Sequence, residues 1–314
     1  MALGPQTVVD SVTSGALYGL VGLGYTLVFR VLRTVNFAHA GEFMLGTMAA
    51  LTVSQALGLQ TGGSGLSNVP QAIGITAICL LAAIAIGAVF AVVVELIGFM
   101  PLRRKRSDRI AGLIVGLAAL IVIQEIAQIW RGPAQEAFPA LFPKMVVLGS
   151  KAGFQIRLDQ LLIVAGSLVT FALVDMVYNH TRFGRAIRAT AENRRVASLM
   201  GINVDRTILL SFAIAGATAG VAAVLFLIDF EFTYFNIGFD IGLKGFTAAV
   251  LGGMGNLRGA LVGGVSLGLI EGIGAGIFGS EWSDVIAFSL LVLVLTIRPN
   301  GILRGEGAVE GVRM

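Results

Sequence analysis

Long stretches without charge dominate the pattern of hydrophobic and polar positions along this chain. No charged side chain occurs from residue 43 to residue 94, and similar uncharged runs recur almost to the C-terminus. A Lys, Arg or Asp at the centre of a bilayer costs about 2.5 to 3.5 kcal/mol, so long uncharged runs mark segments that lie in lipid. The pattern therefore predicts an all-α, polytopic integral membrane protein, with residues 1–314 forming a single transmembrane domain.

The apolar runs predict about eight to nine transmembrane segments, including a broken or re-entrant helix pair, since one span needs about 20 residues. The region 237–297 is the hardest to divide, because the glycine-dense stretch 251–259 interrupts it. The number of full spans in that region stays open. The other predicted spans cover residues 11–29, 40–57, 71–99, 110–130, 159–178 and 207–228.

Composition supplies a packing mechanism for these spans. The chain has 42 glycines among 314 residues, and only 13% of its residues are charged, against about 25% in a soluble domain. In lipid, glycines spaced four residues apart let two helix backbones approach closely. The longest such series predicts helix packing through Gly259, Gly263, Gly268 and Gly272.

The distribution of charge predicts how the chain is oriented. Basic residues concentrate in loops 101–109 and 179–206, whereas segments 229–242 and 271–284 carry acids and neither Lys nor Arg. Short loops rich in Lys and Arg stay cytoplasmic. The two basic loops and the C-terminus are therefore predicted to be cytoplasmic, and the N-terminus and the two acidic segments to be external.

The sequence offers no set of residues for catalysis. One Cys and two His cannot build a metal site at the usual ligand spacings, and no Lys is followed by Ser or Thr, as a phosphate-binding loop of the Walker type requires. We therefore predict a non-enzyme without metal or cofactor of its own. Any ATP-driven step would need ATP and Mg²⁺ in a partner chain.

A polar group near the N-terminus stands at the mouth of an apolar run. Its candidates for a substrate pathway are Asn36, Phe37, His39 and Glu42. Polar side chains in a membrane are costly unless they face water or protein. These residues are therefore expected either to line a pathway or to fix a contact between helices.

The second basic loop contains more than charge. Apolar residues Val196, Leu199 and Met200 follow an Arg- and Ala-rich piece, where an isolated loop has no reason to expose them. The pattern predicts a short amphipathic helix on the cytoplasmic face. Such a helix would lie either against lipid headgroups or in a groove of a partner protein.

Five stretches of the chain resemble the permease subunits of ATP-binding-cassette importers of the branched-chain amino acid family. They are residues 17–28, 35–42, 184–202, 244–264 and 298–301. The resemblance implies a subunit in the inner membrane of a prokaryote that pairs with a second, related permease, engages ABC ATPase subunits and accepts substrate from an external solute-binding protein. It contacts lipid and no nucleic acid. The residues implied in ATPase coupling, within loop 179–206, are Gly184, Arg185, Arg188, Glu192, Ala197, Leu199, Gly201 and Ile202.

The predicted function is therefore ATP-driven import of leucine, isoleucine and valine. Permeases for urea, short amides or sugars are alternatives within the same importer class. An ion-coupled secondary transporter would instead need inverted repeats and broken helices with ion-binding carboxylates, and a membrane enzyme would need a nucleophile, base or metal set. Whether the working complex pairs this chain with a copy of itself or with a different permease stays open.

Overall fold

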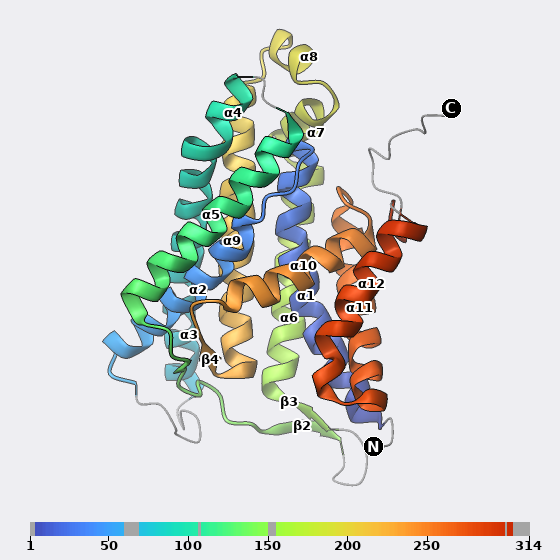
Figure 1. Cartoon of the computed structure of the whole chain (residues 1–314). Coiled ribbons are helices and arrows are strands. Elements are labelled where there is room, and N and C mark those ends of the chain that lie inside the picture. The colour runs from blue at the N-terminus through green and yellow to red at the C-terminus, as the bar shows by residue number, and fades with distance from the viewer. Residues whose placement is uncertain (1–3, 60–68, 106–107, 150–154, 299, 304–314) are drawn as a thin grey trace.

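The computed structural model describes residues 4–59, 69–105, 108–149, 155–298 and 300–303, which form a bundle of long helices (Figure 1). Seven helices in this described part are long and apolar enough to cross a membrane. The predicted all-α, polytopic fold is confirmed. The helices of the first half are α1 (Pro5–Leu32), α2 (Ala38–Ala56), α3 (Val69–Val94), α4 (Met100–Arg104), α5 (Arg109–Arg131) and α6 (Leu158–His180), with a π-helical turn, Glu95–Phe99, between α3 and α4.

The second half begins with two short helices, α7 (Arg182–Glu192) and α8 (Arg194–Leu199), and continues with α9 (Val204–Phe230). The region that the sequence left undivided forms α10 (Ile237–Gly252), α11 (Leu257–Phe278) and α12 (Ser283–Ile297). The predicted break at 251–259 contains the turn between α10 and α11. Gly253 and Gly255 in this turn have φ of 100° and 91°, which only glycine adopts without strain.

Helix α1 lies at the centre of the bundle and packs most extensively against α11 (Figure 1). The contact is close because glycines face each other across it. A Cβ at Gly15 would lie 2.8 Å from the carbonyl oxygen of Gly264, and one at Gly268 would overlap the backbone of Gly15 and Ser11. Small residues thus bring two helix backbones into contact where side chains would hold them apart.

Helix α2 begins inside the bundle and not at the end where α1 stops. After α1 ends at Leu32, the chain turns back, and the backbone at Phe37 reaches Gly116 of α5, where a Cβ would lie 2.9 Å from the Phe37 nitrogen. Helix α10 starts in a similar way, after a short strand, and crosses the bundle obliquely (Figure 1). The bundle therefore contains two helices that start within it, whereas the sequence indicated a break only near residues 251–259.

The acidic segments are shorter as loops than the sequence suggested. Asp229 lies in the last turn of α9, Asp240 in α10 and Glu271 in α11, so only residues 231–236 and 279–282 connect helices there. The helices continue through these acidic positions because each acid has a polar partner or an exposed position. Glu271 in particular is buried, with 7% of its surface exposed.

The outer helices α3, α5 and α6 present apolar side chains outward. Leu81, Ile114 and Val169, one on each helix, are 67%, 59% and 58% exposed. In water such a surface would be unfavourable, and in a bilayer it is matched by lipid tails. These three helices therefore form the lipid-facing side of the bundle.

Both basic loops lie at one end of the bundle, with α4, α7 and α8, and the N-terminus lies at the other (Figure 1). Two small antiparallel ladders occupy the N-terminal end: β1 (Glu136–Ala137) pairs with β4 (Phe232–Thr233), and β2 (Val146–Gly149) pairs with β3 (Gln155–Arg157). Arg106 of the first basic loop and residues 60–68, between the predicted spans 40–57 and 71–99, lie outside the described residues.

Candidate functional site

The segment α7–α8 is shaped by three capping side chains. The Thr181 hydroxyl accepts from Gly184 N at 3.1 Å, Asn193 Oδ1 accepts from Val196 N at 3.1 Å, and Asn203 Oδ1 accepts from Arg206 N at 3.0 Å. Each of these bonds satisfies an N–H group that a helix start leaves unpaired. The predicted amphipathic helix is therefore two helices, which break at Asn193, and α9 begins after Asn203.

Half of the predicted coupling residues hold this segment against the bundle. A Cβ at Gly184 would overlap the Tyr178 carbonyl oxygen, so α7 can pack against the end of α6 only with glycine there. Arg188 donates to the same carbonyl and lies 5.3 Å above the Tyr178 ring. Ala197 is buried and Ile202 is partly buried.

The other predicted coupling residues face away from the bundle. Arg185, Glu192, Leu199 and Gly201 are exposed, and Leu199 and the neighbouring Met200 are 80% and 77% exposed. Together with Val196, at 53%, they form an apolar tip on α8. Exposed apolar groups at a basic, polar end of a membrane protein are typical of a contact surface.

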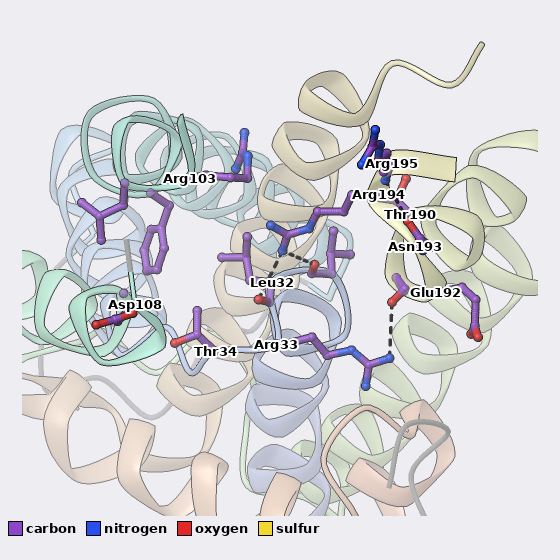
Figure 2. Close-up of a pocket in the computed structure, with 15 residues that line it drawn as sticks. Leu32, Arg33, Thr34, Arg103, Asp108, Thr190, Glu192, Asn193, Arg194 and Arg195 are labelled. Carbon is purple, nitrogen blue, oxygen red and sulfur yellow. Dashed lines mark hydrogen bonds between the residues drawn. The ribbon is translucent and has the colours of Figure 1, made fainter. Parts of the chain in front are cut away.

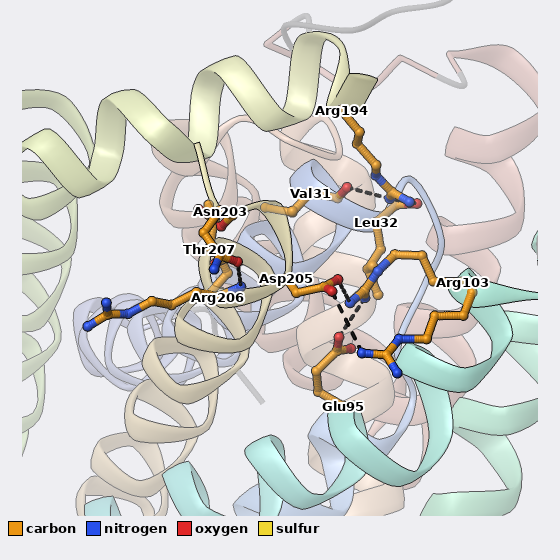
Figure 3. Close-up of polar contacts among 11 residues, drawn as sticks. Val31, Leu32, Glu95, Arg103, Arg194, Asn203, Asp205, Arg206 and Thr207 are labelled. Atoms are coloured by element: carbon orange, nitrogen blue, oxygen red, sulfur yellow. Dashed lines mark hydrogen bonds and ion pairs between the residues drawn. The ribbon is translucent and has the colours of Figure 1, made fainter. Parts of the chain in front are cut away.

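Two arginines fasten α8 and the end of α7 to the last turn of α1. Arg194 Nη2 donates to the carbonyl oxygens of Val31 and Leu32 at 2.8 and 3.2 Å, and Arg33 Nη2 donates to the Ala191 oxygen at 3.3 Å (Figures 2 and 3). Cations are favourable at a helix C-terminus because the last carbonyl groups carry partial negative charge. Burial, and next the positive charge of Arg103, lower the pKa of the Arg194 guanidinium, but an arginine remains charged at neutral pH.

A second connection runs through Arg103 on α4. Its Nη1 lies 2.5 Å from Glu95 Oε1 in the π-helical turn, and its Nη2 lies 2.7 Å from Asp205 Oδ1 in the first turn of α9 (Figure 3). Glu95 is fully buried, so Arg103 offsets the cost of burying its carboxylate. The bridge joins α3 and α4 to the helix that follows α8.

A cavity of about 550 Å³ lies among these contacts, between the end of α1, the α4–α5 hairpin and α7–α8 (Figure 2). Arg33, Arg103, Arg194 and Arg195 line it together with Asp108 and Glu192. The cavity lies between the start of α8 and the residues after α1, where the chain turns back towards α2.

The predicted pathway residues gather where α2 starts. Asn36, His39 and Glu42 are 2%, 0% and 1% exposed, whereas Phe37 is partly exposed. His39 Nδ1 lies 2.8 Å from Glu42 Oε2, and the His39 ring contacts the Tyr25 ring at a centroid distance of 4.9 Å. His39 thus lies against α1 and Asn36 against Gly116 of α5, while Glu42 pairs with His39 on its own helix.

This junction contains several unpaired polar atoms. Asn36 Nδ2, His39 Nε2, Glu42 Oε1 and the Tyr25 hydroxyl are buried and have no hydrogen-bond partner among the residues that the structure describes. Buried polar groups are rarely left unpaired, and internal water is the usual partner. The Phe37 ring packs beside the Phe246 ring of α10, with 5.3 Å between the ring centroids. Gln124 Nε2 of α5 donates to Asn236 Oδ1, just before α10, at 2.7 Å.

The four predicted packing glycines on α11 serve two neighbours. A Cβ on Gly259 would overlap the backbone of Gly252 in α10, and one on Gly263 would overlap Ala248 and Gly252. Gly268 and Gly272 instead lie against Ser11 and Gly15 of α1. One helix thus presents glycine to both α1 and α10.

Lys244 is a charged residue that the sequence reasoning passed over. Its Nζ lies 2.7 Å from Glu271 Oε1 and 2.8 Å from Asp284 Oδ1, which joins α10, α11 and α12. A sequence signal was available, because Lys244 is the only basic residue between Arg206 and Arg258. An ionisable group within a membrane segment marks a candidate functional position.

Comparison with known proteins agrees across nearly the whole length. A family model described as "Branched-chain amino acid transport system / permease component" matches residues 7–295. The high-affinity branched-chain amino acid transport system permease protein BraD of Pseudomonas aeruginosa is 37% identical over 310 residues, which is 98% of this chain and 97% of BraD. LivH of Escherichia coli strain K12, which carries the same description, is 35% identical over 312 residues, covering 98% of this chain and 97% of LivH. A probable branched-chain amino acid transport permease protein of Methanocaldococcus jannaschii is 28% identical over 302 residues, or 90% of this chain and 87% of the relative.

Proposed function

This chain belongs to the permease components of branched-chain amino acid transport systems, and from that membership we propose that it carries leucine, isoleucine and valine across the cytoplasmic membrane as one subunit of an ATP-driven importer. The observation that carries the proposal is the match over residues 7–295, which includes the junction at α2 and the α7–α8 segment alike. The chain is a transport subunit and not an enzyme. It works as a single transmembrane permease domain over residues 1–314.

ATP hydrolysis then takes place in separate ATPase subunits that bind ATP and Mg²⁺. Their docking surface is the apolar tip of α8 formed by Val196, Leu199 and Met200, with exposed Arg185 and Glu192 on the same segment. The support for this surface is its exposure at a basic end of the bundle, beyond the lipid-facing helices. A second, related permease and an external solute-binding protein complete the importer, with lipid as the remaining partner and no role for nucleic acid.

The basic end of the bundle faces the cytoplasm in this proposal. Loops 101–109 and 179–206 both lie at that end, and positively charged short loops stay on the cytoplasmic side. The N-terminus is then external and the C-terminus cytoplasmic. The described parts of stretch 131–157, a stretch that holds four basic residues, lie with β2 and β3 at the opposite end of the bundle, which is external in this proposal.

The substrate pathway passes the start of α2. Phe37 is partly exposed there, and Asn36, His39 and Glu42 lie directly behind it with unpaired polar atoms. A chain that turns back into the bundle leaves backbone groups and polar side chains available where water enters. In the paired complex, a second permease opposite Phe37 would close the pathway from the side.

Reconstitution tests the proposal directly. Proteoliposomes containing this chain, the second permease and the ATPase subunits, supplied with binding protein and radiolabelled leucine, should accumulate leucine only when ATP and Mg²⁺ are present on the cytoplasmic side. Uptake driven by a sodium or proton gradient without ATP would instead identify a secondary transporter. Uptake of urea, acetamide or ribose in place of leucine would keep the importer class and change the substrate.

A further inference from the structure

The outward side of α5 is apolar except for one acidic residue. Between residues 110 and 130, every exposed residue of α5 is apolar except Glu125, and its neighbours on the same side, Val122, Ile126 and Ile129, are 56%, 54% and 85% exposed. Successive residues of a helix are about 100° apart, so Glu125 points away from the side of α5 that packs into the bundle. The buried residues on that packing side are Gly112, Gly116, Leu120, Ile123 and Ala127.

Glu125 lies inside the apolar zone of the bundle and not at its edge. The last residue of α5, Arg131, is about 9 Å further along the helix, and the Glu125 side chain tilts the other way, towards the start of α5. Arg131 Nη2 donates to Thr52 Oγ1 of α2 at 2.6 Å, close to the level where Cys79 of α3 contacts α2. Ile73, about 9 Å further towards that end on α3, is still 57% exposed. The apolar surface therefore extends past the level of the Arg131 guanidinium.

Glu125 differs from the other acids inside the long helices because it is unpaired. It has no hydrogen-bond or ion-pair partner among the residues that the structure describes. Beyond the first and last three residues of the long helices, the other acids all have partners: Asp10 with Gln160, Glu42 with His39, Glu95 with Arg103, Asp175 with Asn179, Asp240 with Tyr234 and Glu271 with Lys244. A lone carboxylate among lipid tails is unfavourable, so Glu125 requires a partner from another molecule.

The position of α5 indicates which molecule lies there. Gly116 of α5 contacts the backbone at Phe37, and Gln124 donates to Asn236 just before α10, so α5 borders the proposed substrate pathway. The proposed function places a second permease opposite Phe37. A subunit that closes the pathway at that point lies beside α5 and can cover its outward side.

The group that pairs with Glu125 is basic and comes from a chain of different sequence. In the described long helices of this chain, every Lys and Arg lies within the first or last three residues, except Lys244. Lys244 is buried and already paired with Glu271 and Asp284. In a symmetric pair each copy offers the other the same surface, so a second copy of this chain would bring no cation to Glu125.

We propose that the second permease covers the outward side of α5 around Val122, Glu125, Ile126 and Ile129, and that an Arg or Lys on one of its membrane helices pairs with Glu125. The inference rests on the proposed function and names the surface through which the two permeases meet. The pair also selects the partner, because the apolar residues around it would fit many surfaces, whereas an unpaired charge penalises a wrong one.

Photo-cross-linking in membranes that contain the whole importer tests the surface. The photoreactive residue p-benzoylphenylalanine replaces Val122 or Ile129 on α5. We expect a light-dependent adduct with the second permease, mapped by mass spectrometry to a membrane helix that contains Arg or Lys. The matched control is the same replacement at Leu81 of α3, which is 67% exposed and should cross-link to lipid alone.

Replacement of Glu125 by Leu gives opposite expectations for a lipid face and for an interface. On a lipid face, Glu125→Leu removes a charge from lipid tails, so the importer should stay intact. At an interface, the variant leaves the cation of the second permease unpaired, and the amount of second permease that co-purifies should fall by about tenfold or more. The isolated variant should keep its thermal stability in detergent. Ile126→Leu, which keeps Glu125, should retain the second permease at the wild-type level.

The outcomes separate this inference from the proposed function. Cross-links from Val122 and Ile129 to lipid alone, or between two copies of this chain, would overturn the proposed surface, and they decide the question if Glu125→Leu fails to fold. Full retention of the second permease by a folded Glu125→Leu variant would overturn the ion pair. Either result beside ATP-dependent leucine uptake by the wild-type importer leaves the function intact, whereas absence of that uptake contradicts the function itself.

Discussion

Arg194, the first residue of α8, donates to the carbonyl oxygen of Val31 at 2.8 Å, so the segment that carries the apolar tip is tied to the last turn of the central helix α1. Five residues after this turn, at Phe37, the chain lies beside the start of α2. The short path from α8 to the junction gives a physical route by which ATPase movement could change the pathway. Each side-chain contact along this route can be removed by a single substitution.

Arg194→Met should uncouple transport from ATP hydrolysis. The variant loses two hydrogen bonds from a charged donor, each worth about 1.5 to 3 kcal/mol, but it leaves the tip of α8 intact. We expect ATPase subunits to bind and hydrolyse ATP while the leucine imported per ATP falls severalfold, measured in proteoliposomes. The neighbouring Arg195 is exposed, so Arg195→Met should keep the wild-type ratio. An unchanged ratio in both variants would show that the α8–α1 contact does not transmit movement.

Glu95→Gln should destabilise the protein more than loss of an exposed charge nearby. Removing one partner of a buried ion pair costs about 3 kcal/mol or more, and Arg103, the partner of Glu95, is itself only 13% exposed in its side chain. Arg104 lies 4.0 Å from Asp205 with 69% of its side chain exposed, and Arg104→Ala should change stability by less than about 0.5 kcal/mol. Thermal unfolding in detergent measures both, and equal losses would contradict a structural role for the Glu95–Arg103 pair.

Gly263→Leu should prevent α10 and α11 from packing. A side chain there meets the backbone of Ala248 and Gly252, which cannot move aside as a flexible side chain would. We expect a large loss of correctly assembled protein in size-exclusion chromatography. Gly74→Leu on α3 is the matched control, because nothing lies within 4 Å of a Cβ at that position. If both variants assemble equally well, close glycine packing on α11 is dispensable.

Much of the architecture could be predicted from the sequence because the bilayer penalises charge. Runs 11–29 and 159–178 correspond to α1 and α6 with shifts of a few residues, since helices extend past the apolar core into the interface. Both basic loops lie together for the same reason. These features depend on composition along the chain and need no knowledge of which helices touch.

Other features depend on contacts between distant segments and gave no local signal. The turn-back at residues 33–37 contains neither Gly nor Pro, and what holds Phe37 in place is Gly116 of α5 and Phe246 of α10. The Lys244–Glu271 pair joins residues 27 positions apart on different helices, so the isolated position of Lys244 in the sequence marks the residue but not its partner. The sequence alone places Glu271 in an external acidic segment, because none of its neighbours along the chain indicates that a lysine would reach it.

Orientation is testable with single cysteines in a variant in which Cys79 is replaced by Ala. Asn193, between α7 and α8, and Glu281, directly before α12, are both exposed, and α8 and the start of α12 lie at opposite ends of the bundle (Figure 1). In intact cells, a membrane-impermeant maleimide should label Glu281→Cys, and it should label Asn193→Cys only after the membrane is opened. Labelling of Asn193→Cys from outside would invert the proposed topology.

Leu199→Asp should detach the ATPase subunits. Leu199 is 80% exposed in this chain, so an aspartate there costs little before assembly, whereas burying an unpaired charge in the ATPase contact costs several kcal/mol. We therefore expect normal insertion and thermal stability, loss of ATPase on purification of the complex, and loss of transport with it. Leu199→Met keeps the apolar contact and should retain both. Retention of the ATPase by Leu199→Asp at the wild-type level would place docking elsewhere and leave the tip of α8 as a surface that rests on lipid headgroups, the alternative that the sequence had left open.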